Sequence, residues 1–369
     1  MKLYIAFFSK AGELLAERIA GLSLKICYGN PVDSSHFIAP RLVCRLRGGE
    51  NLKDWADQAF LEHAPLLFIG AMGIAVRAVA PFVSDKSKDS PVLVMDEKGQ
   101  YVIPMLSGHL GGANELAMQI AEEIGAKAVL TTATDVHGVW AADVFARKNG
   151  LSVINKERIS AISTRLLSGE KIILAIEGVA GSDIEKWEEI FPELLTLNSY
   201  DRKENADLII STRKNALESS SLIMKPKQYI LGIGCKRGIS YGRLQNFVED
   251  KLKELPAVTL DDVAAVASIT RKADEEGLLE FSGRNRIPFY VFSGEELVGV
   301  EGKFQRSKFV EETVGVDNVC ERAAIKASAG ELVLPKQAEN GMTLAVAKIP
   351  KRILYKRLFD GFKEEKNHA

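Results

Sequence analysis

One short segment combines a hydroxyl, an imidazole, an amide and a carboxylate within nine residues, and these groups belong to Ser107, His109, Asn114 and Glu115. An imidazole can act as a general base near neutral pH, and a neighbouring carboxylate can assist it. The glycines of the segment are Gly108, Gly111 and Gly112. N–H groups of a glycine turn before a helix can hold a carboxylate or an oxyanion. The segment is therefore a candidate catalytic loop, although a helix cap at Asn114 and a solvated His109 explain it equally well.

Two further turns follow predicted strands of the same region. Gly70–Gly73 precedes a predicted helix, and Thr131–Gly138 contains Thr132, Asp135 and His137. Ligands of open α/β sheets bind beyond the carboxyl ends of the strands, so we expect all three turns at one edge. Asp135 is placed to orient His137 or His109, and helix capping is the alternative interpretation.

A fourth turn is predicted farther along the chain, at Gly232–Gly238. Its glycine spacing matches a dinucleotide-binding loop only loosely, because the third glycine comes one position late. Lys236 and Arg237, close to Gly234, can pair with ligand carboxylates. A tight turn with a solvated basic pair is the open alternative. Cys235 is expected to be a small packing residue.

These turns require strands and helices to hold them, and the sequence predicts both in alternation. Strands are expected at 3–8, 65–69, 91–95, 101–105, 128–130, 171–176, 206–211, 229–232, 288–292, 332–334 and 342–349. Helices are expected at 11–22, 52–61, 74–83, 113–124, 143–149, 241–255, 261–273 and 318–328. Such alternation predicts an α/β fold with a largely parallel sheet. We predict an N-terminal α/β domain at 1–136, a small central α/β or linker region at 137–227, a separate C-terminal α/β domain at 228–350, and a basic tail at 351–369.

Composition narrows the class of protein. Of the 369 residues, 46% are apolar and 26% are charged, which is typical of a globular chain. The 48 basic and 49 acidic side chains nearly cancel, and this balance argues against a nucleic-acid partner. No segment is apolar for long enough to cross a membrane, and the four cysteines show no metal-binding spacing. We expect a cytoplasmic protein without a metal site of its own.

Several of these segments together resemble one family. The resemblance is carried by Gly70-Ala71-Met72-Gly73-Ile74-Ala75-Val76-Arg77, Ser84-Asp85-Lys86, Asp89-Ser90-Pro91-Val92, Leu106–Glu115 and Thr131–Asp135. Gly232–Gly238, Val314-Gly315-Val316 and Asn318–Glu321 extend it to the C-terminal region. These segments look like the CbiG family of anaerobic cobalamin (vitamin B12) biosynthesis. The resemblance covers nearly the whole chain and is weak at 137–227.

The resemblance implies a hydrolase acting on a carbon–carbon bond of a cobalt-bearing tetrapyrrole, cobalt-precorrin-5A. Water opens the lactone between the ring A acetate and C20, and acetaldehyde leaves to give cobalt-precorrin-5B. The cobalt arrives with the substrate, so no cofactor is implied. The resemblance also allows transient contact with neighbouring pathway enzymes, and no oligomeric state is predicted.

The resemblance also assigns expected roles to the residues found. His109, Glu115, Asp135 and Ser107 are the candidate catalytic residues. The expected substrate-binding residues are Gly70, Gly73, Arg77, Lys86, Gly108, Gly111, Gly112, Asn114, Thr132, His137, Gly234, Lys236 and Arg237. Of these, Arg77, Lys86, Lys236 and Arg237 would hold acetate and propionate arms. We expect the substrate to lie between the N-terminal loops and the Gly232–Gly238 loop.

Two rival functions remain at this point. A non-catalytic carrier of a corrinoid intermediate would bind the same ligand without releasing acetaldehyde. A nucleotide-dependent transferase would use Gly232–Gly238, but the chain has no P-loop and the glycine spacing is imperfect.

Overall fold

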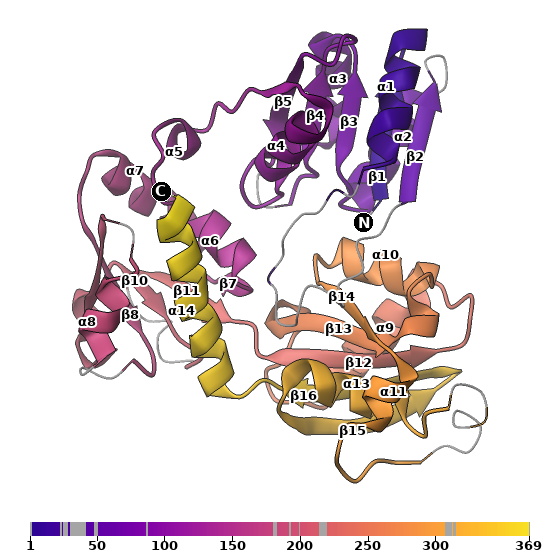
Figure 1. Ribbon diagram of the computed structural model, residues 1–369, viewed down its shortest axis with the longest axis vertical. Coiled ribbons are helices and arrows are strands. Elements are labelled where there is room, and N and C mark those ends of the chain that lie inside the picture. Colours follow the sequence, from indigo (N-terminus) through magenta and orange to yellow (C-terminus); the bar gives the residue numbers. More distant parts are fainter. Residues whose placement is uncertain are drawn as a thin grey trace. The chain divides into compact units, whose positions relative to one another are not determined.

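The computed structural model describes residues 2–22, 24, 29, 42–47, 51–85, 88–179, 183–191, 193–198, 200–213, 220–306, 312 and 315–368, with the backbone alone described for 42–47, 202 and 365–368. The fold is α/β, with one sheet in each of the three regions predicted from the sequence (Figure 1). Two compact units are present. One contains Ala39–Thr132 with the N-terminal segment and Leu279–Arg286, and the other is built mainly from Ala133–Leu278 and Ile287–Ala369. The domain boundaries themselves stay predictions, because the second and third sheets share a unit.

The first sheet has six strands in the order β2-β1-β3-β4-β5-β6. Their bounds are β1 Lys2–Phe7, β2 Leu42–Arg47, β3 Leu66–Ile69, β4 Val92–Met95, β5 Tyr101–Leu106 and β6 Lys127–Ala128. Neighbouring strands are parallel except for β4 and β5, which are antiparallel. The short turn Asp96–Gly99 causes this reversal. The Asp96 carboxylate accepts hydrogen bonds from three backbone N–H groups of the turn and of β5, at 2.7–2.9 Å.

Helices cover both faces of the first sheet. They are α1 Lys10–Ala20, α2 Leu52–Leu61, α3 Met72–Val79 and α4 Ala113–Ile124. Alternate residues of β1 belong to different cores: Ile5 packs in the core that contains residues of α1 and α4, and Ala6 packs in the core with residues of α2 and α3. This two-sided burial explains why the strands read as continuous apolar runs.

The second sheet has five strands in the order β7-β11-β10-β8-β9. The strands are β7 Leu151–Val153, β8 Ile172–Ile176, β9 Leu195–Asn198, β10 Leu208–Ile210 and β11 Leu222–Pro226, and β7 alone pairs antiparallel to its neighbour. The helices of this region are α5 Ala133–Val136, α6 Ala142–Lys148, α7 Ile159–Leu167 and α8 Ile184–Glu188.

The C-terminal segment, predicted as a basic tail, forms helix α14 (Lys351–His368), which packs into the core of the second sheet. Phe362 is fully buried, and its ring stacks on Phe145 of α6 at a centroid distance of 4.1 Å. Leu358 is buried in the same core. Gly361 permits the close approach of α14, because a Cβ atom there would lie 1.8 Å from Asn149 Oδ1. The basic residues Lys351, Arg352, Lys356 and Lys363 are exposed on this helix, and Arg357 is half-buried.

The third sheet has the order β14-β13-β12-β16-β15. Its elements are β12 Tyr229–Cys235, α9 Tyr241–Leu252, β13 Val263–Ile269, α10 Glu276–Arg284, β14 Phe289–Phe292, α11 Gly294–Val298, α13 Val319–Ser328, β15 Glu331–Glu339 and β16 Met342–Lys348. Short 3-10 turns in this region span Leu260–Asp262 and Thr270–Lys272, and those of the first two regions span Ala80–Phe82, Lys156–Arg158 and Tyr200–Asn205.

Two predictions for this third region are wrong. Residues 261–273 were expected to be helical, but Val263–Ile269 is a strand whose seven residues are all buried, between β12 and β14. The alanines suggested a helix, and burial on both faces removes the alternation that marks a strand. The Gly232–Gly238 turn was also placed too early, because β12 runs on through Gly232 and Gly234 to Cys235.

Candidate active site

The Ser107–Gly112 loop follows β5, and the reversal of β5 decides where this loop lies. Leu106 pairs with Val92, the first residue of β4, so the loop lies at the edge where β3 and β4 begin. Gly70 follows β3 and therefore lies at the opposite edge. The expectation that these turns share one edge is wrong. The Ser107–Gly112 loop instead shares its edge with the segment after β6, which is parallel to β5.

Tight backbone packing shapes this loop. Ser107 adopts a left-handed backbone conformation, with φ 54°, and its hydroxyl donates to the Asp89 carbonyl at 2.8 Å. A Cβ atom at Gly108 would lie 2.5 Å from Asn114 Oδ1, and one at Gly111 would lie 2.5 Å from Ser107 Cβ. Gly112 has φ 86°. The three glycines thus have a structural reason to be present, independent of any ligand.

Helix α4 begins directly after the loop, and Gly112 is its N-cap residue. Asn114 is inside the helix, so the alternative interpretation of Asn114 as the cap is wrong. The N–H groups of Ala113 and Asn114 donate to the carbonyls of Ser107 and Gly108, at 3.1 and 3.0 Å. These two helix N–H groups are therefore already used by the loop and do not point to a cradle for an anion.

Asn114 connects the loop to the segment after β6. Its side chain is 5% exposed, and Nδ2 donates to Thr132 Oγ1 at 3.0 Å. The structure therefore brings together Ser107, Asn114 and Thr132 of the predicted set. This hydrogen bond between Asn114 and Thr132 connects helix α4 to the residue just before α5.

Asp89 also lies at this edge, and the sequence analysis named it only within the family resemblance, without a role in the site. Its carboxylate is buried and accepts from the N–H groups of Ser84 and Asp85, at 2.9 and 3.1 Å. These hydrogen bonds connect Ser84 and Asp85 to Asp89, whose carbonyl in turn accepts from the Ser107 hydroxyl. Lys86 of the same loop lies outside the described residues.

His109 and Glu115 flank the start of α4. Both side chains are half-buried, and both make polar interactions within the protein. An imidazole and a carboxylate on one loop and the adjoining helix turn can activate water and transfer a proton.

Asp135 and His137 are exposed and lie in and just after α5, in the second unit. Their predicted role beside His109 stays a prediction.

At the opposite edge, the Gly70–Gly73 turn leads into α3. Gly70 has φ 154°, and a Cβ atom there would lie 2.8 Å from the Phe8 ring. Arg77 is exposed, and its Nη1 donates to the carbonyl of Gly73 at 3.0 Å. This edge contains the switch point of the sheet, since β2 and β3 lie on either side of β1.

In the third sheet, the predicted basic pair lies after the end of β12. Arg237 forms a two-bond ion pair with Asp274, at 3.0 and 3.1 Å, and both side chains are mostly exposed. Lys236 is exposed, and its stem packs across Gly341. Gly234 pairs with Thr343 inside the sheet, so it is not a loop residue. An arm of a ligand would compete with Asp274 for Arg237.

Cys235 is a packing residue rather than a nucleophile. Burial raises the pKa of its thiol to about 11, although Lys272 opposes the shift. The same corner contains Glu275, which is 3% exposed and accepts from the Gly238 N–H and from Lys272 Nζ, both at 2.7 Å. Glu275 thus orders the turn that follows β12.

A buried carboxylate in the second sheet was missed from the sequence. Glu177 follows β8 and is 2% exposed, and it accepts from Thr212 N and Oγ1, Arg213 Nε and Lys351 Nζ, at 2.7–3.0 Å. Burial alone would raise its pKa, but the hydrogen bonds from Lys351, Thr212 and Arg213 outweigh burial and lower the pKa to about 2. Because Lys351 begins α14, Glu177 fastens this helix to the second sheet.

Among the residues with described positions, no group of three or more His, Cys, Asp or Glu side chains is arranged to hold a metal ion. Within the same part of the chain, no helix combines the length and the apolar character needed to cross a membrane.

Comparisons with known proteins match two regions of the chain to one family. Residues 54–135 match the family described as Cobalamin synthesis G N-terminal, and residues 229–347 match Cobalamin synthesis G C-terminus. The cobalt-precorrin-5A hydrolase of Salmonella typhimurium is 33% identical over 351 residues, which cover 93% of this chain and 97% of that protein. The cobalt-precorrin-5A hydrolase of Priestia megaterium is 31% identical over 304 residues, which cover 79% and 80%. Among solved structures, CobE of the cobalamin biosynthetic pathway is 28% identical and covers 34% of this chain and 92% of its own, with a TM-score of 0.32.

Proposed function

The chain belongs to the cobalamin synthesis G (CbiG) family, and we infer from this membership that it is an enzyme, a cobalt-precorrin-5A hydrolase. The observation that carries this conclusion is the length of the match. The similarity to a hydrolase of this name extends over almost the whole of both chains, through the central region as well as the two family domains. A carrier that had kept one domain would not need this full length.

The substrate in this proposal is a cobalt-containing tetrapyrrole with acetate and propionate arms. Its cobalt is part of the substrate, and the chain is proposed to need no cofactor of its own. Water adds to the lactone carbonyl, and the carbonyl–oxygen bond breaks to free the acetate. The oxygen left on C20 becomes the aldehyde oxygen as the bond from C20 to the macrocycle breaks, and a proton replaces C20 on the macrocycle.

We assign the proton transfers to the Ser107–Glu115 segment. His109 takes a proton from the attacking water, and Glu115 assists by holding or returning a proton. Ser107 is better placed as a positioning residue, because its hydroxyl is already bonded to the Asp89 carbonyl. Asn114 and Thr132 position the same loop through their 3.0 Å hydrogen bond. Asp135 and His137 remain proposed helpers.

Basic residues are proposed to bind the carboxylate arms. Lys236 is exposed and suited to this role, and Arg237 would exchange its partner Asp274 for an arm. Arg77 is exposed too, but it follows the turn at the edge opposite the Ser107–Gly112 loop, so it is the weaker candidate. We also propose a cytoplasmic location, in keeping with the uncombined thiols of Cys235 and Cys320.

The test is anaerobic incubation of the purified protein with enzymatically made cobalt-precorrin-5A, followed by assay of acetaldehyde and of product mass. We expect acetaldehyde and the matching loss of mass. We expect His109→Ala and Glu115→Gln to reduce turnover by at least the hundredfold typical of a lost general base. Glu122→Gln, on the exposed side of the same helix α4, is the matched control and should keep full turnover.

Two outcomes would change this proposal. Tight binding of the tetrapyrrole without acetaldehyde would indicate a carrier. Full turnover by both His109→Ala and Glu115→Gln would leave the hydrolase intact but would move the catalytic site away from the Ser107–Glu115 segment.

A further inference from the structure

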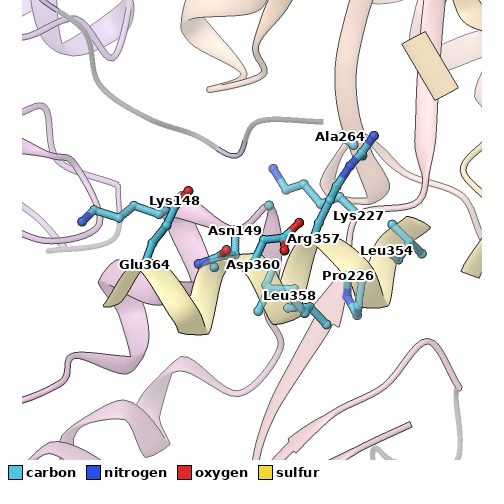
Figure 2. Close-up of a pocket in the computed structure, with 13 residues that line it drawn as sticks. Lys148, Asn149, Pro226, Lys227, Ala264, Leu354, Arg357, Leu358, Asp360 and Glu364 are labelled. Atoms are coloured by element: carbon cyan, nitrogen blue, oxygen red, sulfur yellow. The ribbon is translucent and has the colours of Figure 1, made fainter. Parts of the chain in front are cut away.

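A pocket of about 230 Å³ lies in the second unit, apart from every residue to which the proposed hydrolysis has been assigned. One wall is helix α14, and the others come from the end of α6, β7, the residues after β11, and β13. Leu151, Pro226 and Leu358 give it an apolar floor. Figure 2 shows the charged side chains of Arg357 and Lys227 toward the end of the pocket near Ala264, and those of Lys148 and Glu364 toward the other end.

Arg357 is the unusual group in this pocket. Its side chain is half-buried, and it makes no hydrogen bond or ion pair with any residue in the described ranges. Burial lowers the pKa of its guanidinium to about 10, and the nearby Tyr290 only partly opposes the shift. A cation removed from water is costly unless an anion pairs with it. Within the described part of the chain this cation has no anion beside it, so the pocket is suited to an anion that enters it.

The charges around Arg357 restrict the kind of anion. The planar guanidinium presents two parallel N–H donors that match a carboxylate or a phosphate, and Lys227 adds a second positive charge at the same end. Asp360 and Glu364 also line the pocket, and their negative charges repel an anion that carries more than one charge at one point. This combination favours a carboxylate over a phosphate.

We propose that this pocket binds a carboxylate group of an organic ligand, with Arg357 as the anchoring cation and Lys227 as its neighbour. The proposal does not depend on the hydrolase activity. The carboxylate can belong to a free small acid or to an acetate or propionate arm of a corrinoid, and the two sources give different results in the test.

The test measures binding to the full-length protein by calorimetry and by thermal denaturation, at constant ionic strength. The probes are succinate and propionate as free acids, inorganic phosphate as the competing anion, and cobyrinic acid as a stable cobalt corrinoid with free carboxylate arms. We expect binding of carboxylates in preference to phosphate. Arg357→Gln should weaken that binding roughly tenfold to a hundredfold, the effect of losing a charge-assisted hydrogen bond.

Two further variants separate binding from folding. Arg352→Gln removes an exposed arginine of the same helix that does not line the pocket, and it should bind like the wild type. Arg357→Lys keeps the positive charge but loses the planar pair of donors, and it should bind with intermediate affinity. Without ligand, Arg357→Gln should be as stable as the wild type or more stable, because it removes an unpaired and partly desolvated charge.

Each outcome decides the proposal. Binding of the free acids that depends on Arg357 supports a small-acid site, and binding of cobyrinic acid alone, with the same dependence, supports a site for a corrinoid arm. Phosphate binding as tight as carboxylate binding, or binding unaffected by Arg357→Gln, would overturn it. So would a wild type that binds none of the probes. A loss of stability in ligand-free Arg357→Gln would also count against the proposal, because it would show that contacts within the protein already stabilise this arginine.

Discussion

Replacing Glu177 by glutamine tests how α14 is fastened to the second sheet. The change keeps the shape of the side chain but removes the charge that Lys351 and Arg213 pair with, at 2.8 and 3.0 Å. The fall of the Glu177 pKa from the ordinary 4.5 to about 2 corresponds to about 3 kcal/mol of stability at neutral pH. This value is an upper limit, because Lys351 and Arg213 are more than half exposed and water screens them.

The sign of the pH dependence follows from the direction of the shift. The folded carboxylate holds its proton less tightly than the unfolded one, so its stabilisation is complete above about pH 4.5. It is lost as the pH falls toward 2. We expect the stability difference between the wild type and Glu177→Gln to be largest at neutral pH and to shrink through this range.

The assay is denaturant unfolding at a series of pH values, followed by tryptophan fluorescence. Trp140 and Trp187 both lie in the core that α14 completes, so their signal reports on this region. Glu185→Gln, at an exposed position of α8, is the control and should change stability by less than about 0.5 kcal/mol. Equal stability of Glu177→Gln and the wild type at pH 7, or a difference that does not vary with pH, would refute the reasoning.

Three further predictions concern individual residues and one hydrogen bond. Gly111→Ala should destabilise the N-terminal unit by about 1–3 kcal/mol in thermal unfolding, because its Cβ would lie 2.5 Å from Ser107 Cβ. Gly242→Ala, in helix α9 with open space around it, should be neutral or stabilising by up to about 1 kcal/mol. A double-mutant cycle of Asn114→Ala and Thr132→Val should give a coupling energy of about 0.5–1.5 kcal/mol, and a value near zero would contradict the hydrogen bond. Iodoacetamide should leave Cys235 unmodified at pH 7.5 in the folded protein, since the pKa of its thiol is about 11, and peptide mass spectrometry would detect rapid labelling if this is wrong.

Much of the first sheet was predictable because its strands and helices differ clearly in pattern. The helices predicted at 52–61 and 113–124 have the bounds observed for α2 and α4. The sequence also contained enough information to predict that β5 runs antiparallel to β4, although the sequence analysis did not use it. The turn Asp96–Gly99 joins β4 to β5 directly, and a parallel connection needs a dozen residues or more. The length of this turn therefore already excluded a shared edge for Gly70 and Ser107.

Other features depend on contacts between distant segments and leave little local signal. Val263–Ile269 reads as a helix because alanine favours helices, and its identity as a strand comes from neighbours on both sides. Glu177 became recognisable through Thr212, Arg213 and Lys351, which are remote in sequence. The pairing of Arg237 with Asp274 is similarly non-local, and it changes the availability of a basic residue that the sequence analysis took for a ligand contact.

The position of α14 also constrains how the protein is made. A ribosome synthesises the strands β7–β11 long before it reaches Leu358 and Phe362, which complete their core. During synthesis, apolar side chains such as Trp187 and Phe145 lack their contacts with α14 while the third sheet is being made. Domains ordinarily fold as they emerge, but this one cannot bury its full core until α14 has been synthesised. A chain that terminates before α14 would thus expose the apolar side chains that α14 covers on the second sheet. Chaperones and proteases recognise such exposed apolar surface.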